Sequence, residues 1–368
     1  MSVQFIKKLI PLSVRDGLRN RRIKPVIQYL YRRELEQFIR TSDRLDSAHV
    51  ARVMKQYGYN NKWAAVYTVL NGNPSQEYIP EDFFQIHVLP RMNRMSLIKA
   101  YQDKNMYDLT ELKKFTIPAL VRKIRHSYFD QDYQVITKSK VVEILSGYTK
   151  DIVIKPAIES GSGKDVWIGA SSEAANELFM RNSCADIIVQ ECLEGNNFSK
   201  KINPSSFNTV RCMTAFTGEN YVVLACALRV GRSGTRIDNQ NTGGLVIGLQ
   251  ENGDLCDFAL DKYLISYEKH PDSGFLFKGQ TLPGMAEIRS ACVEAHKALP
   301  HFGLISWDVA LDSAGKVRII ELNIDWQGIN LFQSYLGPLM GPYREQICQT
   351  FDIPSWIKTR PNNLRTGQ

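Results

Sequence analysis

The pattern of apolar and polar positions changes near residue 100. Before that point, apolar residues recur at the three- and four-residue spacing of amphipathic helices, for instance over residues 34–44 and 47–57. Beyond it, short apolar runs are bounded by turn residues, and they predict strands at 135–137, 151–155, 187–193, 211–217, 221–230, 304–311 and 317–323. Helices are expected between them at 108–115, 171–181 and 283–299. The mixture predicts an α+β fold with a helical N-terminal region.

Two of the predicted strands carry acidic residues within apolar runs. Asp308 lies in the run 304–311, and Glu321 and Asn323 end the run 317–323. The residues between them, 312–316, form a good turn sequence, so a hairpin would place Asp308 beside Glu321. Alternation along the second strand puts Glu321 and Asn323 on one face. Such a set of oxygens suits Mg²⁺ that also holds substrate phosphates; the alternative is a hairpin whose acids face solvent.

A strand with a lysine precedes a glycine-rich loop. Lys155 ends the strand at 152–157, and the loop contains Gly161, Ser162, Gly163 and Lys164. Small residues let backbone N–H groups approach phosphate oxygens, and Lys164 adds a point charge. The loop lacks the G-x-x-x-x-G-K-[ST] pattern of a Walker loop. A plain hairpin tip is therefore an equal alternative. The later strand at 187–193 can present backbone groups to an adenine edge or simply belong to the core.

Arginines gather around the predicted hairpin of strands 211–217 and 221–230. Arg211 begins the first strand and Arg229 ends the second, while Arg232 and Arg236 follow in a glycine-rich loop. Planar guanidinium groups bind phosphate or carboxylate through two parallel hydrogen bonds. Solvated surface charge is the alternative for the last two. The polar segment 238–244, which contains Asn239, is either a simple turn or a part of the site that positions an acceptor or a metal-bound phosphate.

Composition and charge restrict the class of protein. The 368 residues are 43% hydrophobic and 23% charged, as in a soluble globular protein with two or three domains. The net charge is +8, and residues 1–40 contribute +7 of it from ten basic and three acidic residues. This basic arm could lie on an anionic membrane surface, bind nucleic acid, or be a solvated helical arm, which we favour. No RNA-binding module signature occurs, so we expect no nucleic-acid partner.

Cysteine and histidine usage excludes several chemistries. The seven cysteines are never closer than eight residues apart, which indicates neither a zinc ribbon nor a disulfide framework and fits the reducing cytoplasm. The six histidines lack metal-site spacing, and G-x-S-x-G is missing. Chemistry that depends on positioning and charge is therefore expected in place of a protein nucleophile.

The order of these pieces resembles the ATP-grasp superfamily. Lys155, the loop at 161–164, the strand at 189–193 and the acids Asp308 and Glu321 follow in that family's order. Asp103-Lys104 resembles the pair that opens the grasp region. Three further pieces resemble the sugar-transfer-associated ATP-grasp family, and they lie at 208–211, at 229–244 and at Trp307-Asp308. The resemblance spans roughly residues 75–340.

The resemblance implies a fold in which two α+β lobes with antiparallel sheets clamp ATP. It implies a helical N-terminal region with a basic arm at 1–100 and a small lobe with the nucleotide hinge at 101–195. A large lobe with the metal site would cover 196–355, followed by a C-terminal tail at 356–368. Two departures are visible. Ser306 stands where many peptide-forming relatives carry an arginine, and a helical region replaces the familiar N-terminal Rossmann-like lobe.

The resemblance also implies roles for individual residues. Asp308, Glu321 and Asn323 would hold two Mg²⁺ ions, and Arg211, Arg229 and Asn239 would serve the acceptor side as catalytic residues. ATP would contact the remaining set, which consists of Lys104, Lys155, Gly161, Ser162, Gly163, Lys164, Gln190, Glu191, Leu193 and Asn197.

The implied activity is an ATP- and Mg²⁺-dependent carboxylate–amine ligase. Its partners would be ATP, a carboxylated sugar, and an amino acid or amine, used in cell-surface or capsule polysaccharide biosynthesis. The expected location is the cytoplasm, where the basic arm could tether the chain to the inner face of the membrane. A sugar or small-molecule kinase and a non-catalytic nucleotide-binding scaffold are the alternatives. No sequence feature predicts the oligomeric state.

Overall fold

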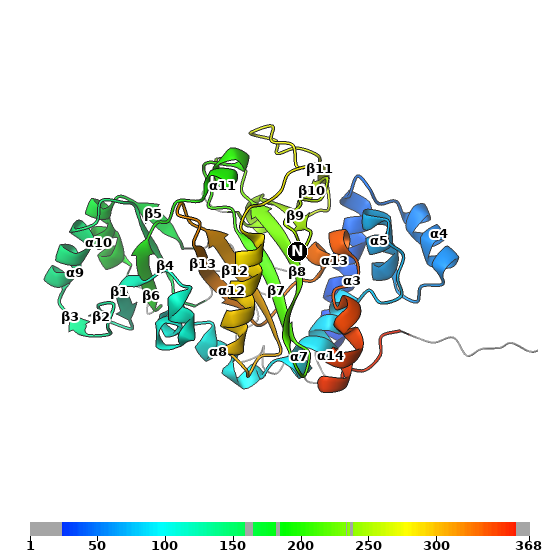
Figure 1. Ribbon diagram of the computed structural model, residues 1–368, viewed down its shortest axis with the longest axis horizontal. Helices are drawn as coiled ribbons and strands as arrows, with labels where there is room; N and C mark the ends of the chain where they lie inside the picture. The colour runs from blue at the N-terminus through cyan, green and yellow to red at the C-terminus, as the bar shows by residue number, and fades with distance from the viewer. Residues whose placement is uncertain (1–23, 159–164, 182–184, 233, 236–237, 358–368) are drawn as a thin grey trace, which may run out of the picture. The chain divides into compact units, whose positions relative to one another are not determined.

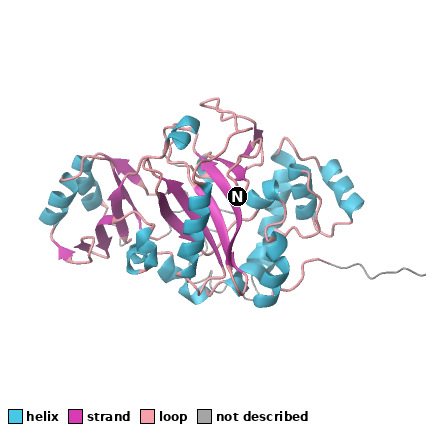
Figure 2. Cartoon of the chain, viewed as in Figure 1, coloured by secondary structure: helices cyan, strands magenta, loops and turns pink. Residues whose placement is uncertain are grey.

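A computed structural model describes residues 24–158, 165–181, 185–232, 234–235 and 238–357. The chain forms two compact units, one from Met1–Met92 with Gly328–Gln368 and the other from Asn93–Gln327 (Figure 1). Figure 2 shows that the first unit is helical and that the strands belong to the second. No helix in the described ranges is both long and apolar enough to cross a membrane.

The helical unit is built from short capped helices. Asp46 caps α4 and Asn61 caps α5, each through a side chain that accepts a backbone hydrogen bond, and Gly58 and Gly72 end the same helices in the left-handed conformation. A π-helical turn interrupts the helical run before Pro90. The elements are α3 (Lys24–Thr41), α4 (Ser47–Tyr57), α5 (Lys62–Asn71), α6 (Glu81–Phe83), η1 (Phe84–Val88), α7 (Leu89–Met92), α13 (Asn330–Leu336), η7 (Gly341–Tyr343) and α14 (Arg344–Thr350).

Buried polar groups fix the C-terminal helices to the rest of this unit. Gln333 is fully buried, and it donates to the carbonyl of Ile79 and accepts from the Ile79 N–H. Glu81 accepts from the backbone N–H groups of Ile329 and Asn330 at 2.8 and 2.7 Å. These bonds join residues about 250 positions apart in the sequence, so they form only after the intervening chain has brought the two segments together.

The second unit begins with short helices and a six-stranded sheet of order β3-β2-β1-β6-β4-β5. Helices α9 and α10 pack against one face of this sheet, and their contacts form its apolar core (Figure 1). A single helix is expected at 108–115, but two 3-10 helices form because Thr110 is extended and caps the second one. The elements are η2 (Met95–Leu97), α8 (Ile98–Tyr101), η3 (Lys104–Leu109), η4 (Glu111–Lys114), β1 (Ala119–Ile124), β2 (Ser127–Phe129), β3 (Val135–Ile136), α9 (Lys138–Ser146), β4 (Ile152–Pro156), β5 (Trp167–Gly169), α10 (Ser171–Met180) and β6 (Ile187–Glu191).

A seven-stranded antiparallel sheet of order β11-β10-β9-β8-β7-β12-β13 completes the second unit. Helix α12 covers one face of it (Figure 1), and the stripe of Met285, Ile288, Cys292 and Ala295 is buried there as the helical spacing predicts. The elements are α11 (Asn197–Ile202), β7 (Val210–Phe216), β8 (Tyr221–Val230), η6 (Gln240–Thr242), β9 (Leu245–Leu249), β10 (Ala259–Leu260), β11 (Ser266–Tyr267), α12 (Met285–Lys297), β12 (Leu304–Leu311) and β13 (Val317–Asn323).

Alternation along the strands separates the core from the polar residues. Val210, Leu228 and Trp307 belong to the core cluster that includes α12. Their neighbours Arg211, Arg229 and Asp308 therefore project from the opposite face of the sheet. The predicted α+β class with two antiparallel sheets and a helical N-terminal region is confirmed.

Candidate active site

The predicted hairpin of β12 and β13 is present and brings its acids together. Asp308 lies opposite Glu321, and Ser306 lies opposite Asn323. The register shifts immediately after Asp308, where the ladder contains a bulge. Because cross-strand partners share a face, all four side chains stand on the face that α12 leaves uncovered.

Asp308 is buried between two arginines. Arg211, its cross-strand neighbour on β7, donates from Nε and Nη2 to the two carboxylate oxygens at 2.7 Å each. Arg229 donates from Nη1 to Oδ2 at 2.8 Å. Burial alone would raise the pKa of Asp308, but the two guanidinium groups lower it to about 2. The carboxylate is therefore charged at neutral pH.

Arg229 joins Asp308 to a second carboxylate. Its Nη2 lies 3.5 Å from Oδ1 of Asp238. Oδ2 of Asp238 accepts from the N–H and the hydroxyl of Thr209, both at 2.6 Å. Burial would lower the pKa of Arg229, but Asp238 and Asp308 outweigh it and raise the pKa. The sequence places Asp238 in the polar segment 238–244 but does not reveal its partner, because Thr209 becomes a neighbour only when β7 and β8 pair.

Two buried lysines approach the other acid of the hairpin. Nζ of Lys104 lies 3.0 Å from Oε1 of Glu321. Lys155 is the penultimate residue of β4 in the smaller sheet, and the backbone N–H of Lys104 donates to the carbonyl of Ala157 just beyond that strand at 2.9 Å. Burial and the nearby Lys104 lower the pKa of Lys155 to about 7, while Glu321 acts in the opposite direction. The structure thus gathers the two predicted lysines beside the hairpin.

The oxygens of Asp308, Glu321 and Asn323 are suitable ligands for Mg²⁺. Two carboxylates and one amide oxygen match the few protein ligands that Mg²⁺ takes when phosphates and water complete its shell. Within the described ranges, no group of three or more His, Cys, Asp or Glu side chains is arranged to hold a metal. Arg211, Arg229 and Lys104 neutralise the two acids. A cation must therefore share or replace part of these ion pairs, while the Asn323 amide donates to the Ser306 carbonyl at 3.3 Å.

The strand expected to meet adenine is the interior strand β6. The Gln190 side chain is buried and donates to the carbonyl of Ile117, so it serves the fold. Glu191 pairs with Lys150 through its side chain. Leu193 follows the end of the strand, and Asn197 is exposed at the first position of α11, where the neighbouring Asn196 is the cap. Only backbone groups near 191–193 and the Asn197 side chain remain suited to a nucleotide.

Other predicted residues lie beside the site or outside the described ranges. Asn239 caps η6 by accepting from the Asn241 N–H at 2.9 Å, so its side chain orders the polar turn next to Asp238. Gly161, Ser162, Gly163 and Lys164 lie outside the described residues, as does Arg236.

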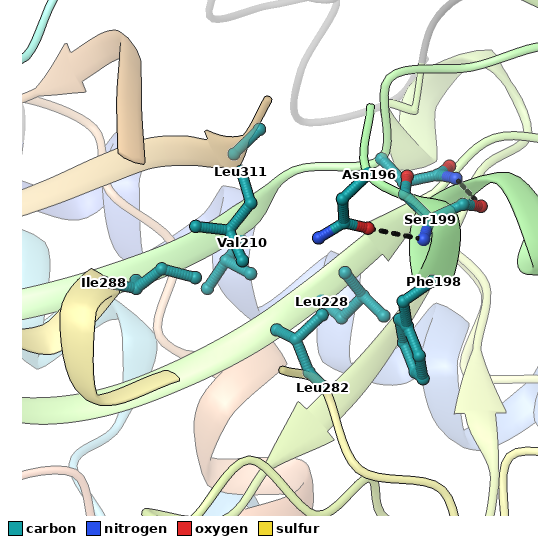
Figure 3. Close-up of a pocket in the computed structure, with 10 residues that line it drawn as sticks. Asn196, Phe198, Ser199, Val210, Leu228, Leu282, Ile288 and Leu311 are labelled. Carbon is teal, nitrogen blue, oxygen red and sulfur yellow. Dashed lines mark hydrogen bonds between the residues drawn. The ribbon is translucent and has the colours of Figure 1, made fainter. Parts of the chain in front are cut away.

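One further hollow lies on the α12 side of the large sheet. Figure 3 shows Val210, Leu228 and Ile288 around it, with Asn196 accepting from the Ser199 N–H. The cavity has a volume of only about 10 Å³ and opens to solvent. Every described residue that lines it is non-ionisable. The acids and bases that could carry chemistry are therefore on the other face of the sheet.

Comparison with known proteins gives a family match. Residues 181–349 match the model of the sugar-transfer associated ATP-grasp family, the family that the sequence motifs resemble. No curated protein matches the chain.

Solved structures with related folds are remote in sequence. D-cycloserine synthetase DcsG is 15% identical, with a TM-score of 0.43 and coverage of 71% of this chain and 73% of that one. The VanG D-Ala:D-Ser ligase from Enterococcus faecalis is 16% identical, with a TM-score of 0.39 and coverage of 68% and 61%. N5-carboxyaminoimidazole synthase from Aspergillus clavatus is 8% identical, with a TM-score of 0.42 and coverage of 72% and 55%, so the match spans about half of that enzyme. Likenesses of this size carry no argument about activity.

Proposed function

We propose that this chain is an ATP- and Mg²⁺-dependent carboxylate–amine ligase. It would form an amide through an acylphosphate, joining an amino acid or amine to a carboxylated sugar in polysaccharide biosynthesis. The observation that carries the proposal is the convergence of two acids with four cationic side chains at the face of the large sheet opposite α12. The family match over residues 181–349 supports ATP as the phosphoryl donor.

The reaction has a simple physical requirement. A carboxylate is a poor electrophile, because its leaving group would be oxide. Transfer of the γ-phosphoryl group of ATP to a carboxylate oxygen releases ADP and creates an acylphosphate, whose leaving group is phosphate. An amine then attacks the carbonyl carbon, phosphate leaves, and the amine loses a proton. Such a path asks mainly for positioning and for neutralisation of charge.

The residues divide this work between them. Arg211 and Arg229 neutralise charge near the acceptor, Asn239 orders the adjoining turn, and Lys104 and Lys155 contact the phosphates of ATP. Asp308, Glu321 and Asn323 would hold Mg²⁺, which supplies further neutralisation of the phosphates when it is bound. The adenine and ribose contacts would come from the backbone of Glu191 and Leu193 and from Asn197. The loop of Gly161, Ser162, Gly163 and Lys164 would cover the terminal phosphates.

The decisive experiment is a screen for ADP release. Carboxylated sugars are crossed with amino acids and simple amines, and the mass of each product is measured. A ligase needs both substrates and yields an amide. A kinase yields a stable phosphorylated compound without an amine, and a scaffold releases no ADP.

A matched pair of variants tests the assignment of the site. Glu321→Ala should abolish ADP release while leaving the fold intact, because it removes a partly exposed ligand and little core volume. Glu294→Ala removes an exposed acid paired with Lys114 in the same unit, and it should leave turnover unchanged. Full turnover by Glu321→Ala would exclude the proposed role.

We also propose a place for the enzyme in the cytoplasm, at the inner face of a membrane. The charge of +7 within residues 1–40 supports attraction to anionic lipid. Residues 1–23 of this arm lie outside the described ranges. Flotation with anionic vesicles should carry the protein upward at low salt, and flotation with zwitterionic vesicles should not.

A further inference from the structure

Helix η3 carries Lys104 between the two sheets of the second unit. At the seven-stranded sheet, Lys104 Nζ lies 3.0 Å from Glu321 Oε1. The Tyr107 hydroxyl of the same helix accepts from the Leu322 N–H at 3.2 Å. At the six-stranded sheet, the Lys104 N–H donates to the Ala157 carbonyl at 2.9 Å. Because the Lys104 side chain is only 3% exposed, it has little room to adjust, and its position follows that of η3.

A buried arginine on β1 fixes the later residues of η3. Arg122 is 0% exposed, and its Nη2 pairs with the carboxylate of Asp108. Its Nη1 donates to the carbonyls of Asp130 and Gln131 in the β2–β3 connection, at 2.9 and 3.0 Å. A buried charge needs such partners, because an unpaired ion in the interior is strongly destabilising. Arg122 therefore joins η3 to the β2–β3 connection in one geometry.

Tyr133 makes a second contact with η3 from the same connection. The Arg122 guanidinium carbon lies 4.1 Å from the centre of the Tyr133 ring, and the Tyr133 hydroxyl donates to the Asn105 carbonyl. Tyr133 has a φ of 60°, in the left-handed region that large side chains rarely adopt. Such a conformation costs about 1–3 kcal/mol and persists only where neighbouring groups hold it. Here Arg122 and the Asn105 carbonyl hold it.

The side chains at the start of η3 do not reach the six-stranded sheet through hydrogen bonds of their own. Asn105 is 2% exposed, and neither polar atom of its amide has a hydrogen-bond partner among the described residues. The Asp103 carboxylate accepts from the Asn105 N–H at 2.9 Å, which is a bond within the turn. The Asn105 carbonyl and the Lys104 N–H are therefore the groups that attach this end of η3 to the smaller sheet.

We propose that Arg122 and Tyr133 are positioning residues, which hold η3 so that Lys104 reaches the phosphates of ATP. This inference rests on the proposed function, in which Lys104 contacts those phosphates. Arg122 acts through Asp108, and Tyr133 acts through the backbone carbonyl of the residue after Lys104. A buried ion pair gives little net stability compared with apolar packing, so its main effect here is on geometry.

Tyr133→Phe is the mildest test, since it keeps the ring beside Arg122 and removes only the hydroxyl that meets η3. Affinity for the non-hydrolysable β,γ-methylene analogue of ATP is measured calorimetrically with Mg²⁺. Tyr133→Phe should weaken binding about three- to tenfold, the range of one hydrogen bond. Tyr128→Phe removes another hydroxyl from the same sheet, where the ring packs on Phe179, and it should change nothing.

A double-mutant cycle separates positioning from a general effect on the fold. Lys104→Met removes the phosphate contact itself and should weaken the analogue about ten- to one-hundredfold. Adding Tyr133→Phe to Lys104→Met should then cause no further loss, because the group that it positions is gone. In the background of Lys113→Met, which removes an exposed lysine of η4, Tyr133→Phe should keep its full effect.

The arginine is tested in the same cycle. Arg122→Lys keeps the charge beside Asp108 but loses the planar fork that meets the two carbonyls and the Tyr133 ring. It should weaken the analogue in the parent chain and have no effect beside Lys104→Met. If Arg122→Lys does not fold, Asp108→Asn breaks the same contact from its more exposed side and should give the same pattern.

The possible outcomes differ clearly. An equal loss from Tyr133→Phe with and without Lys104→Met, or parent-like affinity in the variants of Arg122, Asp108 and Tyr133, would overturn the positioning role. No binding of the analogue by the parent chain would overturn both this role and the proposed function. Failure of the ligase activity alone leaves the cycle intact and is seen as an absence of acid-dependent ADP release in the substrate screen.

Discussion

Asp308 is a buried carboxylate that holds two arginines in place, so its charge matters for both folding and chemistry. Asp308→Asn keeps the shape and removes the charge. Arg229 still has Asp238, but Arg211 loses its carboxylate. We expect loss of ADP release and a decrease of about 3–5 kcal/mol in the free energy of unfolding, as when one partner of a buried ion pair is removed. Urea denaturation measures the second effect.

A matched acid provides the control for that substitution. Asp257 is exposed and pairs with Lys278, so Asp257→Asn should change the free energy of unfolding by less than about 1 kcal/mol. If Asp308→Asn and Asp257→Asn have similar free energies of unfolding, the buried ion pairs of Asp308 do not stabilise the fold.

Lys155 should make nucleotide binding consume a proton. Burial and Lys104 lower its pKa to about 7. Phosphate oxygens favour the charged amine, so binding should raise that pKa again. At about pH 8 the free protein is mostly neutral at Lys155 and should take up close to one proton with the nucleotide. Calorimetry in two buffers of different ionisation enthalpy measures this uptake.

Two lysine variants decide whether Lys155 is the source of the proton effect. Lys155→Met should abolish the uptake and weaken nucleotide binding. Lys262→Met removes a lysine that stacks on Tyr263, and it should preserve the uptake. Equal uptake by the parent chain and Lys155→Met would rule out the assignment.

Sequence patterns indicated the residue types of the site better than their partners. Asp308, Glu321 and Lys155 stood out because a charged residue within an apolar strand needs a partner. The partners themselves depend on how strands pair. Thr209 meets Asp238, and Arg232 meets Tyr267, only after loops and strands 29 and 35 positions apart have come together.

At the scale of elements, local turn chemistry predicted the β12–β13 hairpin, because residues 312–316 favour a tight connection. The bulge beside Asp308 was not predictable, since it depends on packing across both strands. The two 3-10 helices around Thr110 are a similar case. Helical spacing was visible there, but the side-chain cap that divides the segment was not.

The loop that follows β8 is bonded to a residue of positive φ in the neighbouring segment, since the Gly231 N–H donates to Asn208 Oδ1 at 3.2 Å. Asn208 has a φ of 42° and donates to the carbonyls of Ser199 and Asn203 at 3.0 Å each. Asn208→Ala loses these bonds and keeps the strain, whereas Asn208→Gly loses the bonds but tolerates the backbone. The alanine variant should unfold with a free energy about 1 kcal/mol lower than the glycine variant. Equal urea midpoints would show that backbone strain at this position is unimportant.

At the scale of the whole molecule, the α+β class and the helical beginning followed from the period of apolar residues. The return of the chain from Gly328 onward to the helical unit has no local signal. Helix α13 has an ordinary sequence, and its place is set by bonds such as Gln333 with Ile79, 254 positions apart. Period and capping describe only neighbours along the chain, so they cannot predict such a contact.

Glu81 gives this long-range closure a test. Its carboxylate is 1% exposed and accepts from the Ile329 and Asn330 N–H groups ahead of α13. Glu81→Ala leaves those donors buried without that acceptor, which costs about 1–3 kcal/mol per group. Hydrogen exchange should accelerate over residues 329–351 while the strands of the second unit keep their protection. Glu77→Ala, which removes a partly exposed pair with Arg344, should leave exchange nearly unchanged. Faster exchange in both units of Glu81→Ala would mean that the two units unfold together. Faster exchange in the helical unit alone, with the strands still protected, would show that the C-terminal segment unfolds with the N-terminal helices.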